Sequence, residues 1–212
     1  MRFHKTPRWV KILFPQFVWN HPANTKTLYL SFDDGPIPDV TEFVLDVLAQ
    51  YQAKATFFCV GDNVRKYPEV FAKIQLQGHR VGNHTFNHLN GWANEDAVYL
   101  ENIRLCQEMI SPPGSLAGNQ PLPLFRPPYG KIKSSQFRQI RRDYQIIMWD
   151  VLSYDFDRKL PPEICLQKTI RYTRPGSIVL FHDSLKSERS MAYALPRYLG
   201  HFSSLGYTFA AL

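Results

Sequence analysis

Two histidines and two adjacent aspartates are the residues of this sequence best suited to joint chemistry. His84 and His88 stand four residues apart in HTFNH, a spacing that puts two imidazoles on one side of a helical turn, close enough to share a metal ion. Catalytic metal sites usually have three protein ligands and an open position for water. One carboxylate of SFDDGP, which contains Asp33 and Asp34, would complete a His2Asp set and leave the other free.

The two acids would then have different roles in a hydrolytic reaction. A bound metal lowers the pKa of its water and polarises a carbonyl, and a second, ionised carboxylate can take the proton of the attacking water. Arg126 of RPPYG is suited to keep this base ionised through a bidentate pair, on a backbone made rigid by Pro127 and Pro128. His182, at the end of the apolar run IVLFH, can supply a proton to the leaving group.

Five short motifs carry a resemblance to a known family. They are SFDDGP, HTFNH, RPPYG, MWDVLSYDF and IVLFHD. In this order they resemble the polysaccharide deacetylase family, carbohydrate esterase family 4 with its NodB homology domain. The resemblance covers roughly residues 25–212. It implies a metal-dependent hydrolase that removes N-acetyl groups from an N-acetylglucosamine-containing glycan, such as peptidoglycan or a chitin-like oligosaccharide.

The resemblance also implies roles for individual residues. Asp33 would be the general base, positioned by Arg126, and His182 would be the general acid. A divalent metal, typically zinc and alternatively cobalt, nickel or manganese, would be bound by Asp34, His84 and His88. The residues that would contact the substrate are Tyr129, whose backbone N–H would face the oxyanion, Leu180, which would line the slot for the acetyl methyl group, and Pro127.

One motif departs from the family pattern, which often reads Asp-x-x-Asp-Trp in the region of MWDVLSYDF. Leu152 stands at the first acid and Phe156 at the Trp, while Asp155 matches the second acid. The expectation is that His182 either lacks its partner, which would lower its pKa, or finds one in Asp150 or Asp155. Two alternatives stay open for this reason. One is an O-acetyl esterase on an acetylated xylan-type glycan, and the other is a catalytically weak carbohydrate-binding protein.

The elements that must position these residues alternate along the chain. Apolar runs predict strands at 27–32, 55–60, from 81, 145–149, 177–181 and 207–211, and helical periodicity predicts helices at 40–50, 67–77, 95–110, 134–142, 162–172 and 191–204. Residues 111–123, with four prolines and two glycines, are interpreted as a loop. The alternation predicts a mostly parallel sheet or barrel under helices, which the resemblance specifies as a distorted α/β barrel. The chemistry of such folds collects at the carboxyl ends of the strands.

Length and composition indicate a single globular domain. The chain has 212 residues, of which 44% are apolar and 20% charged, so disorder is not expected. We expect a catalytic domain at 25–212 and an N-terminal extension at 1–24 that packs on it. The apolar residues of the extension, among them Trp9, Ile12 and Leu13, could instead lie at a membrane surface.

Charge and cysteine usage narrow the function classes further. The net charge is +7, with basic residues gathered between 131 and 142, but no nucleic-acid-binding signature accompanies them. We therefore expect a solvated helix face or attraction to anionic envelope polymers, and no nucleic-acid partner. No stretch is long and apolar enough to span a membrane, and no export signal is visible, which leaves cytoplasmic and envelope locations open. Three cysteines without CxxC spacing indicate reduced, buried thiols: Cys59, Cys106 and Cys165.

Overall fold

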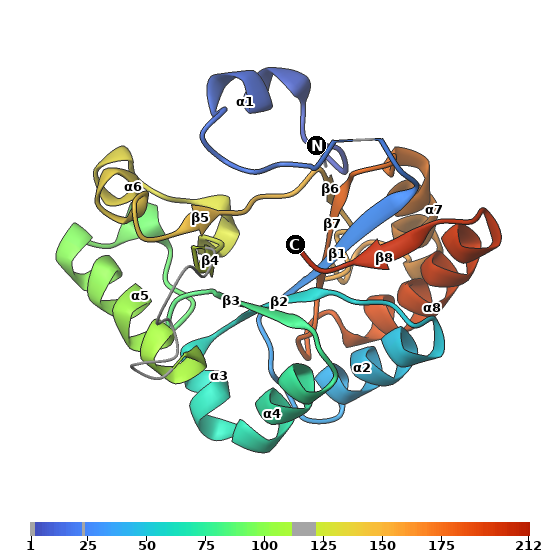
Figure 1. Ribbon diagram of the computed structural model, residues 1–212, viewed down its shortest axis with the longest axis horizontal. Coiled ribbons are helices and arrows are strands. Elements are labelled where there is room, and N and C mark those ends of the chain that lie inside the picture. Colours follow the sequence, from blue (N-terminus) through green and yellow to red (C-terminus); the bar gives the residue numbers. More distant parts are fainter. Residues whose placement is uncertain (1–2, 23, 112–121) are drawn as a thin grey trace.

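The computed structural model describes residues 3–22, 24–111 and 122–212, and its centre is a curled sheet in which every strand pairing is parallel (Figure 1). The strand order is β5-β4-β3-β2-β1-β7-β6, with β8 beside the first half of β1. The strands are β1 (Thr27–Asp33), β2 (Thr56–Cys59), β3 (Arg80–Asn83), β4 (Leu124–Phe125), β5 (Gln145–Ile146), β6 (Val151–Leu152), β7 (Ile178–His182) and β8 (Thr208–Ala210). The predicted distorted barrel is confirmed.

Helices surround the outer face of this sheet (Figure 1). They are α2 (Val40–Gln50), α3 (Gly61–Lys66), α4 (Pro68–Leu76), α5 (Asp96–Ile110), α6 (Ser134–Ile140), α7 (Pro162–Tyr172) and α8 (Glu188–Ser204). The helix α2 shows why these segments form: Asp39 and Glu42 make a capping box at its start, and Val44 and Leu48 are buried on its inner face. No helix in the described ranges is long and apolar enough to cross a membrane.

The side chains of β1 divide between the core and the interior of the barrel. Leu28, Leu30 and Phe32 are fully buried in the core cluster under the helices, and burial of such a side chain contributes about 1.5–3 kcal/mol. Successive side chains of a strand point to opposite faces, so Ser31 and Asp33 point into the barrel. The hydrophobic alternation of β1 therefore determines that the carboxylate of its last residue, Asp33, points into the interior of the barrel.

The structure differs from the sequence-based expectation at several elements. Of the strand expected at 145–149, only the first two residues form a strand, β5; irregular backbone follows, and β6 lies beyond the expected range and was not expected. The helix α3 and the short strand β4 were not expected, and α8 begins at Glu188 rather than Met191 and continues through Pro196. Most of the loop expected at 111–123 lies outside the described residues. The three cysteines are free and buried, as expected.

The N-terminal segment closes the opening between β5 and β6. Val18 pairs with Ile147 in parallel, and Lys5 pairs with Val151 in antiparallel orientation. The helix α1 (Arg8–Leu13) lies between these two contacts. Both edges of the curled sheet are thus covered by chain from the N-terminus.

Candidate active site

The two aspartates of SFDDGP diverge because the backbone turns at the end of β1. Asp33 is the last residue of the strand and is buried, whereas Asp34 has a φ of 84°, in the left-handed region. The side chain of Asn63 donates to the carbonyl of Asp34 over 2.7 Å. A Cβ at Gly35 would lie 1.9 Å from the Asp183 carboxylate, which accepts the Gly35 N–H over 3.0 Å, so only glycine fits here.

His84 and His88 lie on a loop after β3, so the predicted helical turn is wrong. Thr85 and His88 have φ values of 62° and 55°. Local side-chain hydrogen bonds hold this loop: the Asn83 side chain accepts the Thr85 N–H over 2.9 Å, and the Thr85 hydroxyl accepts the Leu89 N–H over 3.0 Å. Such bonds compete with helix formation. The two imidazole rings nevertheless lie with their centroids 5.1 Å apart.

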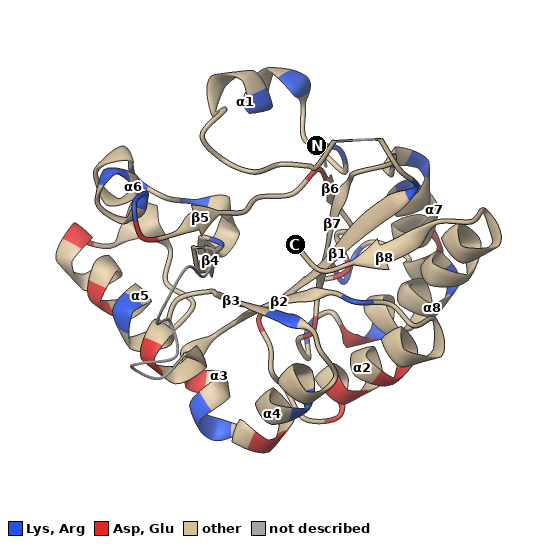
Figure 2. Ribbon diagram, in the orientation of Figure 1, with Lys and Arg blue, Asp and Glu red and all other residues tan. Residues whose placement is uncertain are grey.

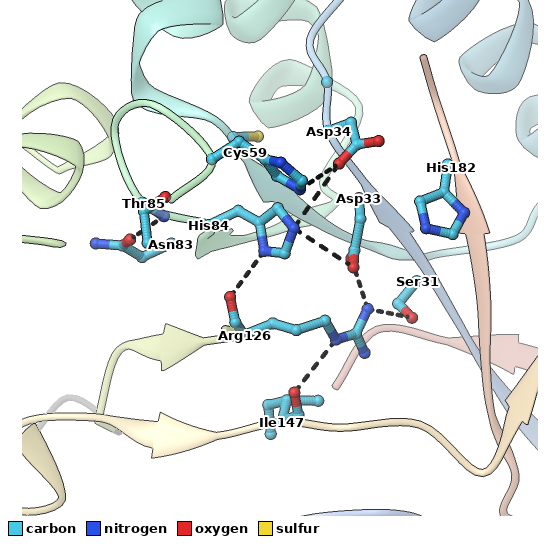
Figure 3. A network of polar contacts seen from close by, with 12 residues as sticks. Ser31, Asp33, Asp34, Cys59, Asn83, His84, Thr85, Arg126, Ile147 and His182 are labelled. Atoms are coloured by element: carbon cyan, nitrogen blue, oxygen red, sulfur yellow. Dashed lines mark hydrogen bonds and ion pairs between the residues drawn. The ribbon is translucent and has the colours of Figure 1, made fainter. Parts of the chain in front are cut away.

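Asp34, His84 and His88 form the one group among the described residues that has the spacing of a metal site. One ligand atom from each lies within 4.8 Å of the others. Figure 3 shows the His84 ring directed toward Asp34. The Asp34 Oδ1 is buried and accepts no hydrogen bond within the described part of the chain, although His88 Nε2 is 3.1 Å and His84 Nε2 3.8 Å away. Two imidazole nitrogens and one carboxylate oxygen suit a divalent transition metal.

The neutral state and the tautomer of His84 support the same interpretation. The Nδ1–H of His84 donates to the carbonyl of Arg126 over 2.7 Å, so its Nε2 presents a lone pair to Asp34. Burial lowers the pKa of His84 to about 4 despite Asp33 and Asp34, which keeps the ring neutral. Burial opposes ionisation of Asp34, but His88, His182 and His84 hold its pKa below the usual range. A cation bound between these atoms would remove the repulsion between the lone pairs that face one another.

Arg126 fixes one oxygen of Asp33 and leaves the other free. The guanidinium has no exposed surface, and its Nη1 donates to Asp33 Oδ1 over 2.7 Å and to the Ser31 hydroxyl over 2.9 Å. The expected bidentate pair is not formed, because Nε and Nη2 donate to the carbonyls of Ile147 and Met148. Oδ2 of Asp33 therefore faces the metal-site side, 3.7 Å from His84 Nε2 (Figure 3).

His182 lies at the end of β7, directly opposite Asp33 in the register of the two strands. Its Nδ1 is 2.8 Å from Asp155 Oδ1, and its backbone N–H donates to Asp155 Oδ2 over 2.8 Å. Of the two alternatives left open for His182, the structure therefore shows the one with a carboxylate partner. Burial alone would lower the pKa of His182, but Asp155, with Asp34 and Asp33, raises it to about 9.

Of the two candidate partners of His182, Asp150 and Asp155, it is therefore Asp155 that supplies the carboxylate. Asp150 lies at the opposite end of the barrel, where its buried carboxylate pairs with Lys5 and Lys11 and accepts from Ser177. Leu152 contributes only its backbone to neighbouring hydrogen bonds, with His4 on the N-terminal segment. The sequence showed that Asp155 matches the second acid of the family motif, but it did not show whether Asp150 or Asp155 reaches His182.

The residues expected to contact substrate lie at the same end of the sheet. Tyr129 has a φ of 61° and an exposed ring whose centroid is 4.7 Å from that of His88. Leu180 is buried on β7, two residues before His182 and hence on the same face of the strand. Pro127 is buried beside Arg126, and Trp149 packs so close to Gly130 that a Cβ there would lie 2.8 Å from its ring.

Three further residues support this site and were not identified from the sequence. They are Ser31, Asn63 and Asp183. Ser31 has a usable signal, since it precedes Asp33 by two residues on a strand and so shares its face. Asn63 and Asp183 act on the turn after β1 from distant positions in the chain. Asp183 ends the motif IVLFHD, but nothing in that motif indicates its contact with the turn, and no local pattern indicates Asn63.

Comparisons with known proteins agree with the geometry. Residues 20–149 match a family model described as polysaccharide deacetylase. A peptidoglycan-N-acetylglucosamine deacetylase of Bacillus cereus is 34% identical over 196 residues, which cover 92% of this chain and 90% of the relative. A chitooligosaccharide deacetylase of Azorhizobium caulinodans is 33% identical over 164 residues, which cover 76% and 75%.

The fold has a close counterpart among solved structures. A crystal structure of a peptidoglycan N-acetylglucosamine deacetylase in complex with 4-naphthalen-1-yl-N-oxidanyl-benzamide matches with a TM-score of 0.85 and 29% sequence identity. The match covers 98% of this chain and 95% of the other. The likeness therefore extends over the strands that carry the site and over the N-terminal segment.

Proposed function

The chain belongs to the polysaccharide deacetylase family, and from this membership we propose that it removes N-acetyl groups from an N-acetylglucosamine-containing glycan by metal-dependent hydrolysis. The products are acetate and a glycan amine. The observation that carries the proposal is the cluster of Asp34, His84 and His88 beside an Asp33 that keeps one oxygen free. Peptidoglycan and chitin-like oligosaccharides are the substrate classes, since relatives named for both are similar to this chain.

The first half of the reaction is the attack of water on the acetamido carbonyl. A divalent cation, most suitably zinc, held by Asp34, His84 and His88 would supply Lewis acidity and lower the pKa of water. Asp33 takes the proton of the attacking water at Oδ2, because Oδ1 is held by Arg126. The backbone N–H of Tyr129 donates to the developing oxyanion.

The second half is the departure of the amine, which needs a proton because an amide anion is a poor leaving group. His182 gives this proton from Nε2, while Asp155 holds Nδ1 and keeps the ring charged. Leu180 lines the slot for the acetyl methyl group, and Pro127 contacts the sugar beside it. In this proposal residues 25–212 are the catalytic domain and residues 1–24 its N-terminal extension.

The two alternatives raised by the departing motif are not favoured. The curated relatives are named as deacetylases of N-acetylated glycans, which are amides rather than acetate esters. The Asp155–His182 pair also removes the reason to expect weak acid catalysis. Strong acid catalysis matters more for an amine leaving group than for an alcohol.

A direct assay tests the proposal. The purified chain is incubated with chitooligosaccharides and with peptidoglycan glycan strands, and acetate and new amines are measured. We expect chelation to abolish release and zinc or cobalt to restore it. Asp33→Asn should lower kcat about 10²–10⁴-fold while metal content, measured by elemental analysis, stays equal to that of the wild type.

The same assay defines the result that would refute the proposal. Acetate release that survives both complete chelation and Asp33→Asn would exclude the mechanism. Release from acetylated xylan that exceeds release from both N-acetylated glycans would instead assign the site to esters.

A further inference from the structure

The helix α1 presents its polar side to the protein and its apolar side to solvent. Lys11 points inward, where its Nζ pairs with the buried carboxylate of Asp150 and donates to the Asn20 side chain. The outward side carries Trp9, Ile12 and Leu13, whose spacing of i, i+3 and i+4 places them on one face. None of the six residues of the helix is buried. This arrangement is the reverse of an ordinary surface helix.

The exposed apolar area around α1 is large. Trp9 is 62%, Ile12 67% and Leu13 63% exposed, and Phe14, directly after the helix, is also exposed. Among the described residues, four of the thirteen exposed large hydrophobic side chains thus lie between positions 9 and 14. Contiguous apolar area of this kind marks an interaction site rather than ordinary surface. We call the side chains of Trp9, Ile12, Leu13 and Phe14 the α1 patch.

Basic residues surround the α1 patch. No acidic residue precedes Asp33 in the sequence, and α1 carries only basic charge (Figure 2). A hollow next to the helix is lined by Arg8 and Arg174 together with the Lys5, Lys11 and Asp150 cluster. Asp150 is already paired with the two lysines, and neither arginine has an acidic partner within the described part of the chain. Arg174 Nη1 donates to the carbonyls of Arg171 and Thr173, which leaves its other N–H groups and the Arg8 guanidinium to meet an external anion.

The α1 patch and the active site lie at opposite ends of the barrel. Asp150 and Ser177, which anchor the segment, immediately precede β6 and β7, whereas His182 ends β7. The five residues of β7 separate these levels by about 16 Å. A surface bound at α1 would leave the catalytic opening directed away from it.

From these observations we infer that the α1 patch docks the protein on an anionic phospholipid bilayer. Trp and Phe prefer the membrane interface, Ile and Leu enter the acyl region, and arginines meet lipid phosphates. A second copy of this chain is a poorer occupant, because two patches would face each other with like charges. A stable dimer also needs about 800 Å² per partner, more than four partly exposed side chains offer. The inference does not depend on the proposed catalysis.

Vesicle flotation with the full-length chain tests the inference. The vesicles are phosphatidylcholine alone, or phosphatidylcholine with about one third phosphatidylglycerol. We expect binding to the anionic vesicles at about 0.1 M salt and weak binding at about 1 M, where screening shortens the Debye length. Trp9→Ser/Ile12→Ser/Leu13→Ser should weaken binding at least about tenfold, and Arg8→Gln about fivefold.

Matched variants separate docking from general effects. Leu76→Ser/Val98→Ser/Leu205→Ser removes exposed apolar side chains elsewhere and should bind like the wild type. Both triple variants should keep the wild-type melting temperature and rate on a soluble oligosaccharide. Trp9→Phe should retain binding. With vesicles that carry brominated acyl chains, its tryptophan fluorescence should be quenched less than that of the wild type, because Trp9 is the tryptophan expected to enter the bilayer.

Several results would overturn the inference. One is a wild-type chain that stays unbound with anionic vesicles at low salt, and another is an α1 triple variant that binds as tightly as the wild type. Equal binding to neutral and anionic vesicles would exclude the role of the arginines. Light scattering without lipid tests for a dimer. A wild-type dimer that becomes monomeric in the α1 triple variant, together with no binding to vesicles, would assign the patch to self-association.

Discussion

Arg126 places a full charge where no side-chain surface is exposed, and its five N–H groups are almost all used. It bonds Asp33, Ser31 and the carbonyls of Ile147 and Met148, and its guanidinium carbon lies 4.0 Å from the centre of the Phe58 ring. Such an arrangement holds a carboxylate in one orientation without any reorganisation during the reaction.

Removal of this charge should therefore destabilise the fold as well as stop the reaction. Arg126→Met leaves Asp33 buried without a partner, and we expect a loss of about 3–5 kcal/mol in the free energy of unfolding, measured by urea denaturation. Arg126→Met/Asp33→Asn should recover part of that loss because the uncompensated charge is gone. Equal stabilities for the single and double variants would contradict this explanation.

The pH dependence of activity should report the Asp155–His182 pair. His182 acts as an acid only while protonated, and its raised pKa of about 9 keeps it protonated at neutral pH. Asp155→Asn removes the charge that raises this pKa, so the alkaline limb of kcat/KM should move to lower pH. Full pH profiles of wild type and variant, with Glu69→Gln as a remote control, measure the shift. An unmoved limb would show that another group sets it.

At the scale of elements, the turn between β1 and α2 depends on a buried acid outside it. Asp183 accepts from the Gly35 N–H over 3.0 Å and from the Thr41 hydroxyl over 2.7 Å. Asp183→Ala leaves the buried Gly35 N–H without an acceptor, which should cost about 1–3 kcal/mol of unfolding free energy. Since Asp34 is adjacent, metal affinity should fall as well. Asp183→Asn keeps an acceptor for Gly35 and serves as the control; a similar loss in both variants would contradict the role of this bond.

The long periodic elements could be predicted from the sequence, and the short ones could not. The helices α2, α5 and α7 each show one apolar face over eleven or more residues, which a pattern reveals. The strands β4, β5 and β6 have two residues each, too few for any period. Their extent follows from pairing with distant strands.

The active site, like the fold, could be predicted from the sequence only in part. The types and spacing of Asp33, Asp34, His84 and His88 predicted the cluster, although the helical turn expected for the histidines is a loop. The partner of His182 could not be chosen from the sequence, because the irregular backbone between β6 and α7 decides that Asp155 reaches it. Such a decision depends on tertiary contacts and not on local preference.

At the scale of the whole molecule, the N-terminal segment is fastened by the buried carboxylate of Asp150. Burial would raise the pKa of Asp150, but hydrogen bonds and charge from Lys11, Lys5 and Ser177 outweigh it and hold this pKa below its ordinary value. A depressed carboxyl pKa contributes stability above the unfolded pKa and loses it as the pH falls through the folded pKa.

Asp150→Asn should therefore reduce stability in a pH-dependent way. We expect a loss of about 1–3 kcal/mol at neutral pH, at the lower end because both lysines are partly exposed. The difference from the wild type should shrink below about pH 4, where the wild-type carboxyl begins to bind its proton. Urea unfolding across this range measures it, and a constant difference at all pH values would exclude the ion pairs as its cause.

One backbone residue joins the N-terminal segment to the general base of the proposed reaction. The N–H of Met148 donates to the carbonyl of Val18 over 2.8 Å, and the carbonyl of Met148 accepts from Arg126, which in turn holds Asp33. The N-terminal segment and the general base are thus joined through the two backbone groups of this one residue. The segment that covers the edge of the sheet therefore also belongs to the frame that orients Asp33.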